Sequence, residues 1–267
     1  MNGFRDLIYL IDMDGTIYRG SAPIPCAKEF IEYLKQAGRK FLLVTNCPGS
    51  STESLIKKLS GMGIELDKGS ILSSGDAAAE YLIKSTSYRK IYCIGSKALQ
   101  DKLAERGLEL VSEKPDCVVV GYDREFDYEK MKNAVQFILD GAAFVCTNYD
   151  ATIPEGEKVV PHTGAIAEGI KAATGVEPVI IGKPESHLLS TVVSRFGCSR
   201  EQCCIVGDRL DTDVYFGVKQ NIKSFLVLTG VTTRDMLKES SIQPTKVFNN
   251  LYELMQFDEK VNSNQAG

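Results

Sequence analysis

Short apolar runs alternate with segments of helical periodicity along most of this chain, and this alternation constrains the fold more than any other feature. Residues 7–11 and 41–44 are apolar runs of strand length, and each is followed by a segment in which apolar residues recur at helical spacing. The same order returns from residue 90 and again from residue 179. The alternation predicts an α/β fold, in which helices cover a parallel sheet.

The composition is that of an ordinary globular protein. Of the 267 residues, 43% are hydrophobic, which is ample for a buried core. The net charge of −4 does not favour nucleic acid as a partner, because nucleic-acid binding usually requires a basic face. No apolar run reaches the length of a membrane span, and early aspartates interrupt any leader-like stretch. The eight cysteines form no C-x-x-C pair, so we expect reduced thiols and a cytoplasmic protein.

Two aspartates follow the first apolar run. The segment Asp12-Met13-Asp14-Gly15-Thr16 comes directly after the run LIYLI. The carboxyl end of a strand is where ligands bind in open parallel sheets. A glycine after the aspartates allows a turn that brings both carboxyl groups to one pocket. Taken alone, the segment is equally compatible with a solvated acidic turn.

A second acidic cluster repeats this pattern near residue 208. The run CCIVG precedes Asp208, Asp211 and Asp213. If the two strand ends are neighbours, each pair of carboxylates about 4 Å apart costs on the order of 4 kcal/mol at an effective dielectric of 20. A bound cation offsets this repulsion, and a site made only of oxygen atoms suits Mg²⁺. The two clusters together therefore predict a magnesium site.

Two further strand ends carry groups that can bind a phosphoryl group. Thr45 and Asn46 follow the run FLLV, ahead of a helix N-terminus that can favour an anion. Lys183 follows the run VIIG. A hydroxyl, backbone amides, a lysine and a magnesium ion can together neutralise a phosphoryl group during transfer. Taken alone, Lys183 is better explained as a solvated turn lysine, but the other three strand ends favour a site.

These four segments, in this order, resemble the motifs of the haloacid dehalogenase (HAD) superfamily. The matched positions are Asp12-Met13-Asp14-Gly15-Thr16, Thr45, Lys183, and Gly207-Asp208 with Asp213. The long insert between the second and third motifs resembles the α/β cap of the NagD-like, 4-nitrophenylphosphatase branch. The resemblance implies a Rossmann-like catalytic core over residues 1–85 and 178–267. It also implies an inserted cap for substrate specificity over residues 86–177.

The resemblance further implies a magnesium-dependent phosphatase of small phosphate monoesters. Asp12 is implied to attack phosphorus and to form an aspartyl phosphate. Asp14 is implied to protonate the leaving oxygen and then to activate water. Lys183 is implied to neutralise charge on the nucleophile and the phosphoryl group. Paired carboxylates in opposite protonation states fit these two roles.

The same resemblance assigns the remaining core residues. Thr45 and the Asn46 amide are implied to hold phosphoryl oxygens, together with the loop residue Cys47. Cys47 is a departure, because that branch usually has a second asparagine at this position. The implied magnesium ligands are Asp12, the backbone carbonyl of Asp14, Asp208 and, through a bound water, Asp213.

The insert contains a stretch at residues 148–164 that is long, polar and rich in turn residues, as expected for a loop that contacts substrate. Within it, Asp150 and His162 are the predicted substrate-binding residues. For His162, a surface or helix-end packing role is nearly as well supported. The physiological ester is open among sugar phosphates, nucleoside monophosphates, phosphoglycolate and pyridoxal phosphate.

Two other functions remain as alternatives. A phosphotransferase or phosphomutase of the same superfamily would transfer the phosphoryl group to a second hydroxyl instead of water. A receiver-like signalling module also gathers aspartates, a threonine and a lysine around Mg²⁺, but such modules are about half this length. The expected partner is a small phosphate ester, with no nucleic acid and no membrane. Caps of the resembling branch often take part in dimers, which implies a homodimer through the cap.

Overall fold

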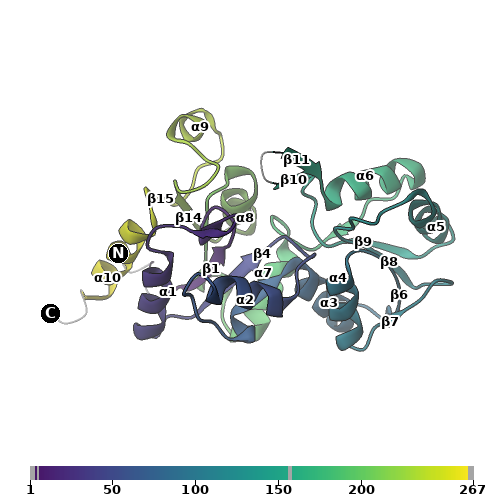
Figure 1. Ribbon diagram of the computed structural model, residues 1–267, viewed down its shortest axis with the longest axis horizontal. Coiled ribbons are helices and arrows are strands. Elements are labelled where there is room, and N and C mark those ends of the chain that lie inside the picture. The colour runs from purple at the N-terminus through teal and green to yellow at the C-terminus, as the bar shows by residue number, and fades with distance from the viewer. Residues whose placement is uncertain (1–3, 5, 156–157, 264–267) are drawn as a thin grey trace. The chain divides into compact units, whose positions relative to one another are not determined.

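The computed structural model describes residues 4, 6–155 and 158–263, and the chain divides into two compact units. The first unit contains residues 1–44, 53–72 and 196–267, and the second contains residues 45–52 and 73–195. Each unit is built on a parallel sheet with helices packed against it (Figure 1). The α/β fold class predicted from the alternation of strands and helices is therefore confirmed.

The sheet of the first unit has six strands. They are β1 (Ile8–Asp12), β4 (Phe41–Thr45), β5 (Ile71–Ser73), β13 (Cys203–Gly207), β14 (Lys223–Val227) and β15 (Lys246–Phe248). Their order is β15-β14-β13-β1-β4-β5, and the pairs from β15 through β4 are parallel. Residue Ile11 of β1 lies opposite Val206 of β13. The carboxyl ends of β1 and β13 are therefore adjacent, as the magnesium-site prediction requires.

Helices and shorter elements accompany this sheet in the first unit. They are α1 (Ala27–Gln36), α2 (Thr52–Ser60), α8 (Tyr215–Gln220), α9 (Arg234–Glu239) and α10 (Leu251–Ser263), with short turns η2 (Lys68–Ser70), η3 (Arg200–Gln202) and η4 (Leu210–Val214) and the small hairpin β2 (Tyr18–Arg19) and β3 (Ala22–Pro23). Phe30 of α1, Leu59 of α2 and Leu254 of α10 share one buried cluster with Tyr9 and Val206 of the sheet. Helices α1, α2 and α10 bury their apolar faces against the sheet, which accounts for their helical spacing of apolar residues, whereas α9 has no buried residue.

A buried carboxylate fastens α10 to this core. Asp258 is 1% exposed and accepts hydrogen bonds from the hydroxyl groups of Tyr9, at 2.5 Å, and Tyr33, at 2.6 Å. Arg39 pairs with the same carboxylate at 3.0 Å and is itself mostly buried. Burial and the negative charge of Asp258 raise the pKa of Tyr9, so this phenol stays protonated and donates. The carboxylate thus satisfies one buried phenol and two partly buried polar groups at once.

We expect Asp258→Ala to destabilise the protein strongly. The substitution leaves the buried guanidinium of Arg39 and two phenols without their acceptor. Removing one partner of a buried pair costs about 3–5 kcal/mol. Thermal unfolding measures the effect, with Asp235→Ala as the control, because Asp235 is an exposed partner of Lys238 on α9. The control is expected to stay within about 0.5 kcal/mol of the parent, and equal losses from both variants would contradict a structural role for Asp258.

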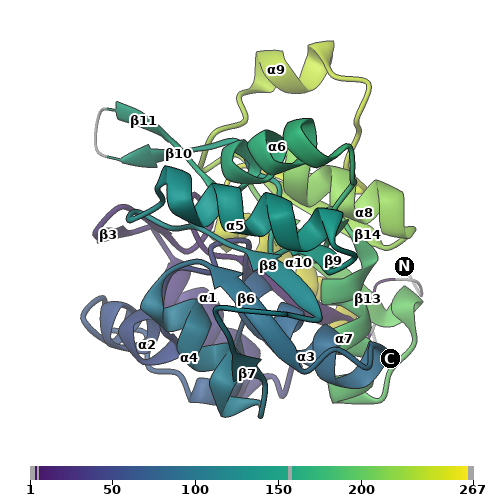
Figure 2. The same ribbon diagram turned by 90° about the vertical axis from the view of Figure 1, so that its right-hand side faces the viewer.

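The second unit contains a five-stranded parallel sheet. Its strands are β6 (Lys90–Ile94), β7 (Glu109–Leu110), β8 (Cys117–Val120), β9 (Ala143–Cys146) and β12 (Val179–Ile180), in the order β12-β9-β8-β6-β7. Its helices are α3 (Ser74–Ser85), α4 (Lys97–Glu105), α5 (Tyr128–Leu139), α6 (Thr163–Thr174) and α7 (Ser186–Phe196). Apolar residues of α3 and α4 form a buried cluster with one face of the sheet, and those of α5 and α6 with the other (Figure 2).

The polar stretch at residues 148–164 differs from the loop that its composition predicts. It contains an antiparallel hairpin of β10 (Thr152–Glu155) and β11 (Lys158–Pro161). Its strands include Thr152, Ile153, Val159 and Val160, and β-branched residues favour extended backbone. The composition of the stretch therefore obscured a strand signal that four β-branched residues carry.

Helices α3 and α7 group with the insert in the second unit, so the two compact units do not coincide with the domain boundaries expected near residues 86 and 178. The extent of the cap as a specificity domain concerns function and stays a prediction. Throughout the described part of the chain, every helix is too short or too polar to traverse a lipid bilayer.

Candidate active site

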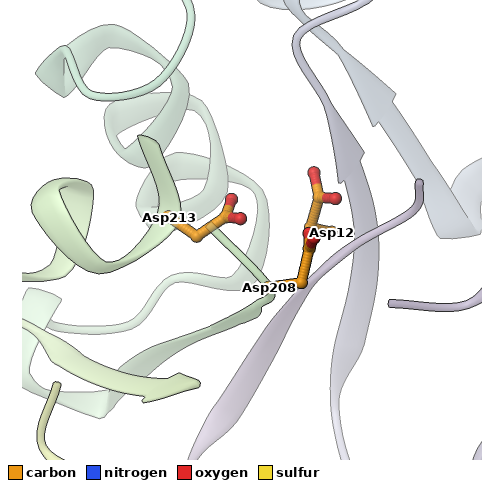
Figure 3. Close-up of side chains that lie close together, drawn as sticks. All are labelled: Asp12, Asp208 and Asp213. Atoms are coloured by element: carbon orange, nitrogen blue, oxygen red, sulfur yellow. The ribbon is translucent and has the colours of Figure 1, made fainter. Parts of the chain in front are cut away.

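Three carboxylates meet at the adjacent ends of β1 and β13. Asp12 is the last residue of β1, Asp208 directly follows β13, and Asp213 lies in the turn η4. One oxygen from each lies within 4.8 Å of the others (Figure 3). Asp208 and Asp213 are each 1% exposed, and Asp12 is half-buried. The shared strand ends thus bring together three acidic residues from two segments about 200 positions apart.

The backbone around these carboxylates holds them in place. The amide of Val231 donates to Oδ2 of Asp208 at 2.6 Å, and the amide of Arg209 donates to Oδ2 of Asp213 at 3.2 Å. A Cβ atom at Gly207 would overlap the Asp213 carboxylate, and a Cβ atom at Gly230 would overlap that of Asp208. Both glycines therefore allow the chain to approach a carboxylate more closely than any other residue permits.

Asp14 stands apart from the three grouped carboxylates. Although its side chain is exposed, desolvation by surrounding atoms raises the pKa of its carboxyl group above the ordinary value. The positive charges of Lys58 and Arg19 act in the opposite direction without cancelling this effect. Gly15 follows with a φ of 84°, a conformation that glycine adopts without strain. A carboxyl group with a raised pKa is suited to carry a proton.

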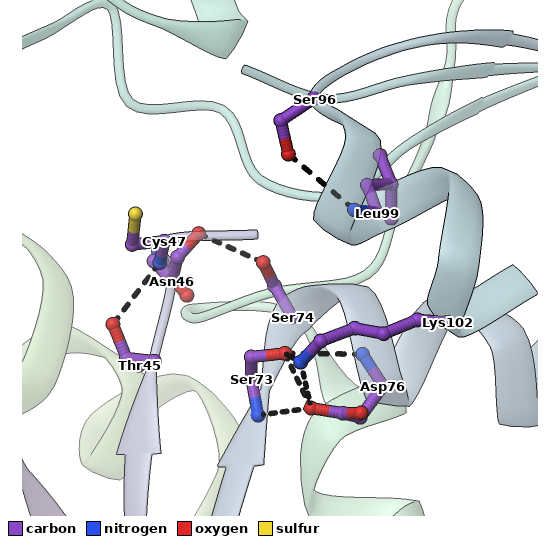
Figure 4. A network of polar contacts seen from close by, with 9 residues as sticks. All are labelled: Thr45, Asn46, Cys47, Ser73, Ser74, Asp76, Ser96, Leu99 and Lys102. Atoms are coloured by element: carbon purple, nitrogen blue, oxygen red, sulfur yellow. Dashed lines mark hydrogen bonds and ion pairs between the residues drawn. The ribbon is translucent and has the colours of Figure 1, made fainter. Parts of the chain in front are cut away.

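The loop after β4 belongs to the second unit and is fixed by two helix starts, and Figure 4 shows the first of these contacts, from Ser74 to Asn46. The hydroxyl of Thr45 accepts a hydrogen bond from the amide of Cys47 at 3.1 Å. Ser74, the first residue of α3, donates to the carbonyl of Asn46 at 2.7 Å, and Ser96 before α4 donates to the carbonyl of Gly49 at 3.3 Å. The loop containing Thr45, Asn46 and Cys47 is therefore held in one conformation.

Cys47 takes part in this loop through its backbone amide and through its thiol, which interacts with the backbone of Gly49 and the side chain of Ser50. Burial raises the pKa of its thiol, so the neutral form is favoured over the thiolate. A neutral thiol is a weak hydrogen-bond donor and brings no negative charge to a loop that is expected to hold an anion.

Lys183 lies between β12 and α7 and is 3% exposed. The side chain of Asn46 contacts its backbone twice: Oδ1 accepts from the amide of Lys183 at 2.8 Å, and Nδ2 donates to its carbonyl at 2.9 Å. Gly182 is required beside this contact, because a Cβ atom there would lie 2.6 Å from Oδ1 of Asn46. The structure thus joins the second and third predicted motifs, which are 137 positions apart in the chain.

Asp150 and His162 lie in the same unit and are linked through Asn148. Nδ2 of Asn148 is 2.7 Å from Oδ2 of Asp150 and 3.1 Å from Nδ1 of His162. His162 is 2% exposed and its ring stacks on Tyr122, with ring centroids 4.6 Å apart. Burial lowers the pKa of His162, so its ring is favoured in the neutral form. Its predicted substrate contact stays a prediction.

The structure therefore arranges the predicted residues in two sets. Asp12, Asp208 and Asp213 come together in the first unit, with Asp14 on the same strand end. The second set lies in the second unit: Thr45, Asn46, Cys47, Asp150, His162 and Lys183. Asn148 and Tyr122 were missed as single residues. Asn148 follows strand β9 by two positions, so the strand-end rule applied to the core could have selected it in the insert as well.

Comparisons with known proteins agree with this architecture. A family model described as haloacid dehalogenase-like hydrolase matches residues 9–109, and one described as HAD-hydrolase-like matches residues 180–254. The acid sugar phosphatase of Staphylococcus saprophyticus is 36% identical over 253 residues, which cover 94% of this chain and 98% of that protein.

Solved structures are similar over nearly the whole chain. The 4-nitrophenylphosphatase of Thermotoga maritima has a TM-score of 0.91 and 34% identity, covering 95% of this chain and 98% of that one. NagD of E. coli has a TM-score of 0.86 and 27% identity, covering 93% and 97%. The resemblance stated from the four motifs is therefore confirmed. The chain is an enzyme that belongs to the haloacid dehalogenase-like hydrolases, in the branch of NagD and the 4-nitrophenylphosphatases.

Proposed function

We propose that this enzyme is a magnesium-dependent phosphatase that hydrolyses small phosphate monoesters through an aspartyl phosphate on Asp12. The observation that carries the proposal is the meeting of Asp12, Asp208 and Asp213 at adjacent strand ends. The names of the relatives support the reaction class, because they are called sugar or 4-nitrophenyl phosphatases.

The three carboxylates fit a hard divalent cation. One oxygen of each carboxylate lies close enough to the other two for a single ion to bind all three, and two of the three residues are almost fully buried. Buried like charges at this spacing repel one another, and a cation among them removes the cost. Asp12, Asp208 and Asp213 are the residues that would hold Mg²⁺, which prefers oxygen ligands. When bound, Mg²⁺ would neutralise charge on the phosphoryl oxygens and favour in-line attack.

In the proposed first step, an oxygen of the ionised Asp12 carboxylate forms a bond to phosphorus. The bond between phosphorus and the leaving oxygen breaks, and Asp14 gives its proton to that oxygen. In the second step, the Asp14 carboxylate takes a proton from water, and the water oxygen bonds to phosphorus as the bond to Asp12 breaks. The raised pKa of Asp14 supports its role as the proton carrier.

The motif matches support roles for the second set of residues. In this proposal, Thr45 and the amide of Asn46 bind phosphoryl oxygens, and Lys183 neutralises negative charge on the phosphoryl group. The hydrogen bonds of the loop support this assignment, because those made by Thr45, Ser74 and Ser96 fix its backbone before any ligand arrives. A preorganised loop does not have to reorganise during the reaction.

A phosphate-release screen tests the proposal. Wild-type protein is incubated with Mg²⁺ and a panel of esters: 4-nitrophenyl phosphate, sugar phosphates, nucleoside monophosphates, phosphoglycolate and pyridoxal phosphate. We expect 4-nitrophenyl phosphate and at least one natural ester to release inorganic phosphate. The background is set by the Asp12→Asn variant purified in parallel. Release no faster than this background for every ester would contradict the proposal, and transfer to a second sugar hydroxyl would instead indicate a phosphomutase.

A further inference from the structure

We propose that Asp150 is a positioning residue, which holds Asn46 and through it the backbone segment that carries Lys183. The proposal rests on the proposed function, in which Lys183 acts on the phosphoryl group. It gives Asp150 a different role from the substrate contact expected from the composition of its surrounding stretch.

The carboxamide of Asn46 makes three hydrogen bonds that fix its orientation. Oδ1 accepts from the amide of Lys183, and Nδ2 donates both to the carbonyl of Lys183 and to Oδ2 of Asp150, at 3.0 Å. If the amide were reversed, its NH₂ group would face the N–H of Lys183, and its oxygen would face two acceptors. The orientation that binds both backbone groups of Lys183 is therefore the one that a carboxylate at position 150 requires.

Asp150 is itself anchored from the opposite side. Its Oδ2 also accepts from Nδ2 of Asn148, which is fully buried and receives a hydrogen bond from the hydroxyl of Thr147 at Oδ1, at 3.2 Å. The backbone of Asp150 is anchored as well, because its carbonyl accepts from the amide of Gly164 at 2.9 Å in the first turn of α6. A Cβ atom at Gly164 would overlap the neighbouring carbonyl of Tyr149. The position of the carboxylate is thus set by the sheet and by α6.

These side-chain hydrogen bonds connect the insert to the backbone of Lys183, in addition to the backbone hydrogen bond from the amide of Gly182 to the carbonyl of Thr147. The same carboxylate oxygen of Asp150 serves two amides, and charge-assisted hydrogen bonds of this kind are stronger than neutral ones. A displacement of a catalytic group by about 1 Å can cost about a hundredfold in rate. Loss of the Asp150 carboxylate is therefore expected to lower the rate through Lys183, without any contact to the substrate.

Two variants of Asp150 separate this role from substrate contact. Asp150→Ala removes the acceptor, and we expect kcat to fall about 10- to 100-fold by a similar factor for every ester, with KM changed less than about threefold. Asp150→Asn can place its amide oxygen where Oδ2 lies and accept both hydrogen bonds. It is expected to keep kcat within about threefold of the wild type. Asp140→Ala, at an exposed aspartate of the same unit, is the control and should be neutral.

The coupling to Lys183 is tested in a double-mutant cycle. If Asp150 acts through Lys183, adding Asp150→Ala to Lys183→Ala should lower the remaining kcat less than about twofold. Additive losses, or a reordering of the ester panel by Asp150→Ala, would overturn the proposal and indicate direct contact with the substrate. Failure of Asp150→Asn to restore activity would also overturn it, provided that its melting temperature matches the wild type.

A measurement without turnover keeps this test separate from the proposed function. Hydrogen–deuterium exchange of a peptide covering residues 182–185 is expected to quicken in Asp150→Ala, because the Lys183 amide loses its fixed acceptor. It should stay at the wild-type rate in Asp150→Asn and in Asp140→Ala. Unchanged exchange in Asp150→Ala would overturn the positioning role even in an active enzyme. Faster exchange in a protein that hydrolyses no ester would leave the positioning role standing and reject the proposed function alone.

Discussion

Replacing Asp12 with asparagine is expected to lower kcat for every phosphate ester to less than about one hundredth of the wild-type value. An amide has nearly the shape of the carboxylate, but it cannot supply the oxygen anion that attacks phosphorus. A higher residual rate could be explained by direct attack of water with general acid–base assistance, and it would contradict a covalent mechanism. Initial rates with 4-nitrophenyl phosphate at saturating Mg²⁺ measure the loss.

The fold of this variant should be intact, which makes the loss of activity interpretable. Asp12 shares a small volume with Asp208 and Asp213, so neutralising it removes repulsion between buried like charges. The melting temperature of Asp12→Asn in metal-free buffer is therefore expected to equal or exceed that of the wild type. A lower melting temperature would mean that Asp12 holds the strand end together, and the loss of rate would then say little about a nucleophile.

The covalent intermediate can be examined directly in the wild type. Beryllium fluoride mimics a phosphoryl group, and with Mg²⁺ it is expected to bind the carboxylate of Asp12. Fluorine resonances of the bound species should appear in the wild type and be absent in Asp12→Asn. An asparagine variant that retains substantial turnover, or a bound fluoride that survives the substitution, would show that the phosphoryl group is not transferred to Asp12.

The acidic residues could be predicted from the sequence because the parallel sheet relates distant segments by a simple rule. Asp12 and Asp208 each follow an apolar run, and strands β1 and β13 pair in the centre of the sheet. Once the alternation of strands and helices establishes a parallel sheet, the carboxyl ends of its strands lie at one edge. The local signal of each segment was weak, and their combination carried the prediction.

The hydrogen bonds of the second unit could not be predicted in the same way. Asn46 and Asp150 are 104 positions apart, and their contact depends on side-chain directions that no periodicity encodes. The polar composition near residue 150 indicated a substrate loop. The structure instead shows a hairpin whose base is anchored to α6 and a carboxylate that faces two amides. Polar residues in a stretch of this kind satisfy one another as readily as they face a ligand.

Cys47 illustrates a similar limit at a single position. Its place beside Thr45 and Asn46 follows from the motif, but the sequence does not tell which part of the residue is used. In the structure its amide binds the hydroxyl of Thr45, and any residue except proline can supply that contact. The substitution of a cysteine for the usual asparagine therefore leaves this backbone hydrogen bond of the loop available.

Removing the divalent cation is expected to abolish activity almost completely. Excess EDTA should reduce phosphate release to less than about one hundredth, and added Mg²⁺ should restore it. Calcium should restore little, because Ca²⁺ accepts more ligands and looser geometry than in-line transfer needs. The reason lies in the three grouped carboxylates, two of them buried, whose mutual repulsion would otherwise persist beside an anionic substrate.

Variants of two aspartates in one segment test whether the metal dependence arises from the three grouped carboxylates. Asp208 belongs to the carboxylate group, whereas Asp211 is exposed and pairs with Arg209, which lowers the pKa of Asp211. Asp208→Asn can still accept the hydrogen bond from Val231, but it removes one charge from the site. We expect it to raise the Mg²⁺ concentration for half-maximal rate at least about tenfold, and Asp211→Asn to change it less than about twofold.

Thermal unfolding provides the same comparison without substrate. A cation that binds only the folded protein raises the free energy of unfolding by an amount that grows with its concentration relative to its dissociation constant. The melting temperature of the wild type and of Asp211→Asn should therefore rise with Mg²⁺, and that of Asp208→Asn should rise much less. Equal shifts in all three proteins would place the cation elsewhere, and full activity of the wild type in EDTA would reject a metal-dependent mechanism altogether.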